Sequence, residues 1–201
     1  LCARLEDGRV IRGESSIPDA RGTIEQVYLD PPGSKPTAEV LSSLRTANAV
    51  ILGPGSLFTS VIPNLLVEGL EEALRQLTVP RIYVCNVMTQ PGETDGFGAA
   101  DHLEALEKHI GAGLIDIIVV NIATPSEEML RRYEAQGARP VEPQLDRLEK
   151  MGVQVVGANL LSDHDLVRHD SERLATAIFD LLARHHSKAR DGATRRLRVV
   201  K

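Results

Sequence analysis

The feature that most constrains the fold is an apolar run that leads directly into a glycine turn and a group of hydroxyl side chains, at residues 49–63. Residues 49–52 (Ala-Val-Ile-Leu) have the length of a strand buried on both faces of a sheet. The Gly-Pro-Gly turn at 53–55 is tight, and Ser56 is placed to cap the helix that follows. A side chain at Gly55 is expected to strain this turn and to block an approaching phosphate. Backbone N–H groups therefore gather just beyond the strand, where open parallel sheets bind ligands.

The turn does not match either of the two best-known phosphate-binding motifs. No lysine lies between Lys35 and Lys108, so the Gly-Lys-Ser/Thr end of a P-loop is missing. Phe58 stands where the third Gly or Ala of G-x-G-x-x-G belongs. From spacing alone two interpretations stay open. One is a phosphate site to which Thr59 and Ser60 add hydroxyls, and the other is a glycine-rich strand–helix turn with capping hydroxyls.

Apolar runs alternate with amphipathic stretches along most of the chain, which predicts an α/β class with a Rossmann-like, mostly parallel sheet and helices on both faces. Strands are expected at 49–52, 82–87, 116–120 and 153–156, and helices at 37–47, 65–76, 98–110, 126–136, 142–150 and 172–186. Strand-like segments at 9–13 and 23–29, joined by a turn-rich connection, predict a short β excursion near the N-terminus. We expect one α/β domain over 1–186 and a basic, disordered tail over 187–201.

The composition excludes several classes of protein. The 201 residues carry a formal charge of −5 and only 3% aromatic side chains, which argues against a nucleic-acid binder. No apolar stretch approaches the length of a membrane span, which is about 18 residues or more. Cys2 and Cys85 are far apart, and Cys85 lies in an apolar run. A buried free thiol and a reducing, cytoplasmic compartment are therefore expected.

Three loops follow the predicted parallel strands and should meet at one edge of the sheet, at 53–60, 86–96 and 121–126. The second loop is rich in hydrogen-bonding side chains: Asn86, Thr89, Gln90, Thr94 and Asp95. For Asp95, a turn or helix-capping role is favoured over recognition of a ribose or a base. None of these loops contains a recognised catalytic signature. The residues support a site for an anionic, hydroxylated ligand.

Other candidate residues lie outside these loops. His102 and His109 are seven residues apart on one predicted helix, too far for joint metal binding, so packing is the favoured role. The acidic, histidine-containing run at 162–170 lacks the spacing of a helical zinc pair, so a metal is not favoured there. Arg168 could clamp an anion or pair with a neighbouring aspartate, while Tyr133 is more typical of a packing residue than of a ligand contact.

Five segments of the chain resemble the bacterial gluconeogenesis factor family (YvcK-like proteins), which belongs with the phospholactate transferases in a CofD-like superfamily. They are residues 12–15, 53–66, 85–96, 101–103 and 167–169. The likeness covers most of the chain, and a fourteen-residue motif such as 53–66 is highly specific.

The resemblance implies a cytoplasmic regulator that binds a sugar nucleotide of the UDP-N-acetylglucosamine class and supports cell shape and cell-wall synthesis during gluconeogenic growth. Its partners would be the sugar nucleotide, a protein of cell-wall synthesis and further copies of itself as a homo-oligomer. The ligand contacts implied are Gly53, Pro54, Gly55, Ser56, Thr59, Ser60, Asn86, Thr89, Thr94, Asp95, Tyr133 and Arg168. Family members normally begin with a Gly-Gly-Gly-Thr-Gly loop. Because this chain begins at Leu1 without that loop, a fragment holding the C-terminal two thirds is expected.

Two alternatives to the regulator remain. The first is a transferase of the phospholactate type, in which Mg²⁺ would accompany the bound nucleotide and Asp95 would be its candidate ligand. That branch carries Ser-Asn-Pro where this chain has Gly-Ser-Leu at 55–57, which favours the regulator. The one cofactor considered is Mg²⁺ bound together with a nucleotide. The second alternative is an interaction scaffold whose glycine turn is purely structural.

Overall fold

A four-stranded parallel sheet forms the centre of the molecule in the computed structural model, which describes residues 1–162 and 169–197. Its strand order is β4-β5-β6-β7, so each strand lies beside the next one in the chain. The strands are β4 (Val50–Leu52), β5 (Arg81–Val84), β6 (Ile117–Asn121) and β7 (Gln154–Ala158). Helices connect successive strands, as parallel pairing requires. The predicted α/β class with a parallel sheet is confirmed.

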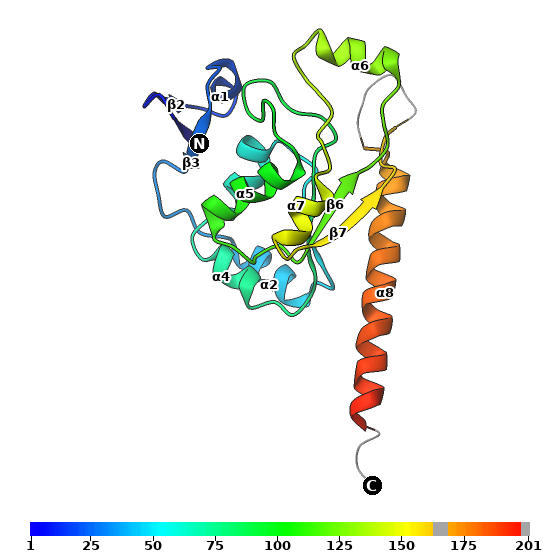
Figure 1. The fold of residues 1–201 in the computed structure, drawn as a ribbon. Coiled ribbons are helices and arrows are strands. Elements are labelled where there is room, and N and C mark those ends of the chain that lie inside the picture. Colours follow the sequence, from blue (N-terminus) through cyan, green and yellow to red (C-terminus); the bar gives the residue numbers. More distant parts are fainter. Residues whose placement is uncertain (163–168, 198–201) are drawn as a thin grey trace.

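A separate antiparallel sheet of order β2-β1-β3 forms the predicted N-terminal excursion (Figure 1). It comprises β1 (Cys2–Leu5), β2 (Val10–Arg12) and β3 (Ile24–Tyr28). The short helix α1 (Ser16–Asp19) lies between β2 and β3 in the chain. β1 was not predicted from the sequence, and the residues of α1 were expected to form a turn. Buried Ala3, Leu5 and Val27 join this sheet to the main core.

Most of the remaining helices agree with the predicted ranges to within a few residues. They are α2 (Ala38–Thr46), the π-helical turn η1 (Leu57–Val61), α3 (Ile62–Leu65), α4 (Leu70–Arg75), α5 (Ala99–Ile110), α6 (Glu127–Glu134), α7 (Leu145–Lys150) and α8 (Ser171–Leu197). The helix expected at 65–76 is instead divided into α3 and α4. Gly69, with φ +85°, precedes α4 and separates the two helices. None of the helices in the described ranges combines the length and apolarity needed to cross a membrane.

The side chains of the central strands alternate between two apolar layers. On one face Tyr83 and Ile118 pack with the buried residues of α5 and α7. On the other face Ile82 and Val119 pack against Ile178 and its neighbours on α8. The alternation follows from the two-residue repeat of a strand, and the cover on both faces explains why β5 and β6 are continuous apolar runs.

The strand β4 differs from the prediction that it is buried on both faces. It lies at the edge of the described sheet, and Ile51 is 46% exposed. The apolar run therefore correctly predicted a strand but not its position in the sheet, because an edge strand of three residues can carry the same residue types as a central one.

The helix α8 is longer than expected. It continues over 187–197, where the sequence predicted a disordered tail, and Figure 1 shows it running beside the sheet and on past it. The charges of this segment suggested a tail, but a continuous helix accommodates Lys, Arg and Ala well.

Candidate functional site

A cleft of about 910 Å³ opens beyond the carboxyl ends of β4 and β5. Its lining residues come from the glycine turn, the loop after β5, the segment around the end of α6, and the residue two positions before the start of α8. They are Pro54, Gly55, Ser56, Asn86, Val87, Met88, Thr89, Gln90, Pro91, Tyr133, Gln136, Ala138 and His169. The cleft lies at the sheet edge where ligands of α/β proteins bind.

The structure brings together about half of the residues proposed from the sequence. Those that line the cleft are Pro54, Gly55, Ser56, Asn86, Thr89 and Tyr133. Those that lie in the same loops without lining it are Gly53, Thr59, Ser60, Thr94 and Asp95. Arg168 falls outside the described residues.

Gly53, rather than Gly55, is the glycine whose conformation the turn requires. Gly53 has φ +83°, and an added Cβ would lie 3.0 Å from the carbonyl oxygen of Val84. At Gly55 the φ is not positive, and a Cβ would have 3.4 Å to the Cβ of Ser60. The expected backbone strain at Gly55 is therefore wrong, although Gly55 does line the cleft.

Ser56 does not cap the following helix with its side chain, contrary to the prediction. Its backbone carbonyl instead accepts hydrogen bonds from the N–H groups of Ser60 and Val61, which starts the π-helical turn η1. Its hydroxyl oxygen accepts a hydrogen bond of 2.7 Å from Nε2 of Gln90. The glycine turn and the loop after β5 are thereby joined at the wall of the cleft.

A second link joins the same two loops behind the cleft. The hydroxyl of Thr59 donates to Oε1 of Glu93 over 3.0 Å. Glu93 is only 5% exposed, and its burial raises the pKa of the carboxyl group. The link gives Thr59 a supporting role in the structure and orders the loop that carries Gln90.

Three polar side chains of the second loop bond to the protein backbone. The hydroxyl of Thr94 accepts from the backbone of Gln90, and Thr94 is fully buried. Asp95 accepts a 2.6 Å hydrogen bond from the N–H of Gly92, which is the turn role favoured from the sequence. Thr89 accepts from the N–H of Arg139 and so ties the loop to the segment after α6.

The third loop contributes to the cleft through the helix that follows it. Ser126 caps α6 by accepting from the N–H of Met129, as predicted. Tyr133, near the end of α6, packs partly buried against a small apolar cluster that contains Val87 and Ala138, and it also lines the cleft. The packing role and the cleft-lining role of this tyrosine therefore coexist.

Two histidines have clear structural roles. His102 is fully buried with Nδ1 2.9 Å from the carbonyl of Gly98, while Nε2 of His109 accepts from the N–H of Val27. Both pack, as expected. His169 lines the cleft, a position that was not predicted, since the sequence pattern around it was weighed only as a possible metal site. Within the described residues no three His, Cys, Asp or Glu side chains are grouped closely enough to hold a metal ion.

Cys85 follows β5 directly and is buried. Burial raises the pKa of its thiol to about 12, so the nucleophilic thiolate is scarce at neutral pH. Cys2 is buried as well.

We expect no reaction with a thiol reagent such as dithiobis(nitrobenzoate) at pH 8 in the native state, and two reacting thiols after unfolding in guanidinium chloride. A rapidly reacting thiol in the native protein would contradict the burial of these side chains.

The fold and the cleft define an α/β protein with an open cleft beyond the carboxyl ends of parallel strands. The model of the family described as 2-phospho-L-lactate transferase CofD matches residues 1–161, and the chain belongs to this CofD-like family.

Two relatives of the chain are both named gluconeogenesis factor. The chain is 43% identical over 183 residues to the gluconeogenesis factor of Bacillus subtilis strain 168, and 42% identical over 181 residues to that of Halalkalibacterium halodurans. These matches cover 90% of this chain but only 58% and 56% of the relatives. The crystal structure of a UPF0052 family member from Bacillus halodurans is 41% identical, with a TM-score of 0.85 over 89% of this chain and 57% of that chain.

Proposed function

We propose that the cleft binds a sugar nucleotide of the UDP-N-acetylglucosamine class, and that the protein uses this binding to regulate cell-wall synthesis and cell shape during gluconeogenic growth. The relatives called gluconeogenesis factors support the physiological part of the proposal. A cytoplasmic location and a protein partner in wall synthesis belong to the same proposal.

The observation that carries the proposal is the hydroxyl of Ser56 at the wall of the cleft. Because its oxygen accepts from Nε2 of Gln90, its own proton is free to be donated to a ligand. The hydroxyl stands beside the glycine turn, where a phosphate can approach the backbone closely. The amides of Asn86 and Gln136 add hydrogen-bonding groups for the hydroxyls of a sugar.

The alternative is a transferase of the phospholactate type, which the family description favours. A transferase that uses Mg²⁺ needs carboxylate ligands near the phosphates. None of the described residues that line the cleft is Asp or Glu, and Asp95, the candidate ligand, is engaged with the N–H of Gly92. The donor groups of the lining thus fit the binding of a sugar nucleotide better than metal-assisted transfer.

Calorimetric titration of the full-length protein with UDP-N-acetylglucosamine tests the proposal, with GDP and NAD as comparison ligands. We expect binding without turnover, and a Ser56→Ala variant that loses about 1 kcal/mol of binding free energy, as for one hydrogen bond. Ser60→Ala is the matched control, because Ser60 lies in the same turn but does not line this cleft.

The outcomes separate the three functions. Release of a nucleoside monophosphate or of a transferred group would establish the transferase. Unchanged affinity in the Ser56 variant would remove the glycine turn from the site. If none of the three nucleotides binds, only the scaffold remains.

A further inference from the structure

The backbone at His169, at the wall of the cleft, is tied to neighbouring segments by several contacts. Its backbone forms an antiparallel bridge with Leu161, and the N–H of Asp170 donates to the carbonyl of Leu160 over 2.8 Å. The carboxylate of Asp170 then accepts from the N–H groups of Glu172 and Arg173 in the first turn of α8. The imidazole therefore projects from a fixed backbone position between a strand end and a capped helix.

The position of the ring proton follows from one contact. Nε2 of His169 lies 3.1 Å from the carbonyl oxygen of Cys85. A carbonyl oxygen can only accept, so Nε2 carries the hydrogen and Nδ1 of the neutral ring is an acceptor. None of the described residues makes a hydrogen bond to Nδ1. Burial lowers the pKa of His169, which favours the neutral ring.

The donor and acceptor roles of two side chains at the cleft are thus set by their neighbours. Ser56, oriented by Gln90, is a donor beside the glycine turn. His169, oriented by the Cys85 carbonyl, is an acceptor in the same cleft. None of the described lining residues carries a full charge, and among them His169 is the side chain that titrates closest to neutral pH.

We propose that neutral His169 accepts, at Nδ1, a hydrogen bond from a hydroxyl or N–H group of the bound sugar nucleotide, with the phosphates placed toward Ser56. The inference rests on the proposed function and adds a specificity-determining residue to it. In this arrangement the uncharged part of the ligand lies at the His169 side of the cleft.

The competing role for this residue is a protonated imidazole that pairs with phosphate. The two roles predict opposite effects of pH. An acceptor is lost when Nδ1 is protonated, so affinity falls in acid, whereas an imidazolium that pairs with phosphate strengthens binding in acid. Both phosphates of UDP-N-acetylglucosamine are diesters with one charge each throughout this range, so the ligand does not contribute to the change.

Other titratable groups lie in the same cleft or beside His169 in the chain. Tyr133 lines the cleft, Cys85 carries the carbonyl that the ring contacts, and Asp170, Glu172 and Arg173 follow His169 at the start of α8. The His169→Asn variant corrects for them. Its amide oxygen can replace Nδ1 as an acceptor but does not titrate, so any pH dependence that remains in this variant comes from the other groups.

The experiment is calorimetric titration of the full-length protein and its variants with UDP-N-acetylglucosamine between about pH 7.5 and pH 5, with circular dichroism to verify folding at each pH. For the wild type we expect an affinity loss of about fivefold or more over this range, as protonation removes the acceptor. His169→Asn should show a much flatter profile. His169→Gln can keep the donor to Cys85 but not the acceptor, and should bind about tenfold more weakly at pH 7.5.

A wild-type affinity that stays constant or rises in acid overturns the inference while leaving the proposed function intact. Normal binding by His169→Gln at pH 7.5 overturns it as well. Absence of binding by the wild type at pH 7.5 refutes the proposed function and the inference together.

Discussion

Replacing Gly92 with Ala is expected to destabilise the protein by about 3 kcal/mol or more, because it combines an overpacked contact with a strained backbone. Gly92 has φ +84°, a conformation that costs an L-residue about 1–2 kcal/mol. An added Cβ would also lie 2.1 Å from the carbonyl oxygen of Pro18 in α1. The contact is with backbone, so a rotamer change cannot relieve it, and α1 and the loop must separate.

Gly96→Ala is the matched control for this prediction. Gly96 lies in the same loop with φ +76°, but an added Cβ there meets no atom within 4 Å. The Gly96→Ala substitution should lower the free energy of unfolding only by the strain of the left-handed backbone, about 1–2 kcal/mol. Equilibrium unfolding in urea measures both variants. If the two lose equal stability, the close approach of Pro18 to Gly92 does not restrict this position.

The Gly92 variant should also bind ligand more weakly. Gly92 follows Gln90 and Pro91, which line the cleft, and its N–H is held by Asp95. A displaced loop would move Gln90 away from Ser56 and release the hydroxyl that it orients. A stability loss with unchanged affinity would show that the Gln90 contact does not depend on the turn.

The central strands and helices could be predicted from the sequence because their patterns are local. The apolar runs at 82–87 and 116–120 and the amphipathic period of 98–110 each identified their element to within a few residues. What could not be predicted depends on contacts between distant segments. The edge position of β4, with Ile51 exposed, is set by strand order, which a single apolar run does not encode.

The candidate site shows the same division. The glycine turn at 53–55 and the loop after β5 could be placed at the sheet edge because both follow predicted parallel strands. Which side chain of each loop faces the cleft was not predictable. Thr59 turns to Glu93 while Ser56 turns to Gln90, and both pairs are 34 residues apart in the sequence. The place of His169 at the cleft was not predictable either, because the carbonyl that its ring contacts belongs to Cys85, 84 residues earlier.

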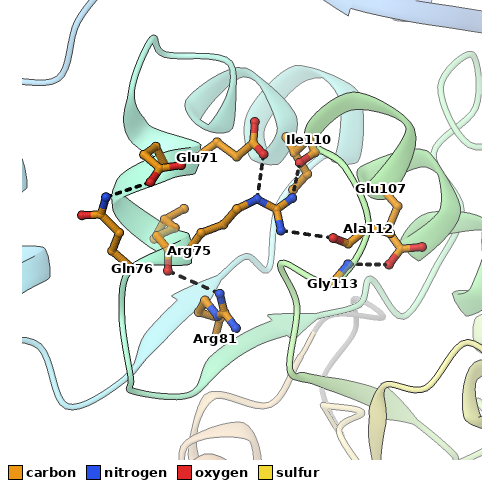
Figure 2. Close-up of polar contacts among 10 residues, drawn as sticks. Glu71, Arg75, Gln76, Arg81, Glu107, Ile110, Ala112 and Gly113 are labelled. Carbon is orange, nitrogen blue, oxygen red and sulfur yellow. Dashed lines mark hydrogen bonds and ion pairs between the residues drawn. The ribbon is translucent and has the colours of Figure 1, made fainter.

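Arg75 links α4 to the end of α5 through its guanidinium group. Figure 2 shows its guanidinium reaching from α4 to the C-terminus of α5. It donates to the carbonyls of Ile110 over 2.8 Å and Ala112 over 3.1 Å, and Nε pairs with Glu71 at 2.8 Å. These carbonyls belong to the end of α5 and the turn after it, where a helix leaves acceptors unpaired and a cation is favourable.

Arg75→Met should therefore lower the free energy of unfolding by about 2 kcal/mol, as expected for losing charged hydrogen bonds to one partly buried and one exposed carbonyl. Arg75→Lys should recover only part of this, since an ammonium group cannot reproduce the planar fork of donors. Arg131→Met is the control. Arg131 pairs with Glu127 at the same i,i+4 spacing, but both side chains are largely exposed, so the loss should be about 0.5 kcal/mol or less.

Arg75 and the cleft lie at opposite ends of β5. The backbone carbonyl of Leu74, next to Arg75, accepts from Arg81, the first residue of β5. The cleft lies beyond the opposite end of that strand. Arg75→Met should thus change the urea midpoint without changing the affinity for UDP-N-acetylglucosamine, measured where the variant remains folded. A loss of affinity that parallels the loss of stability would mean that the two ends of β5 are energetically coupled, and that the cleft is not positioned independently by the loops that line it.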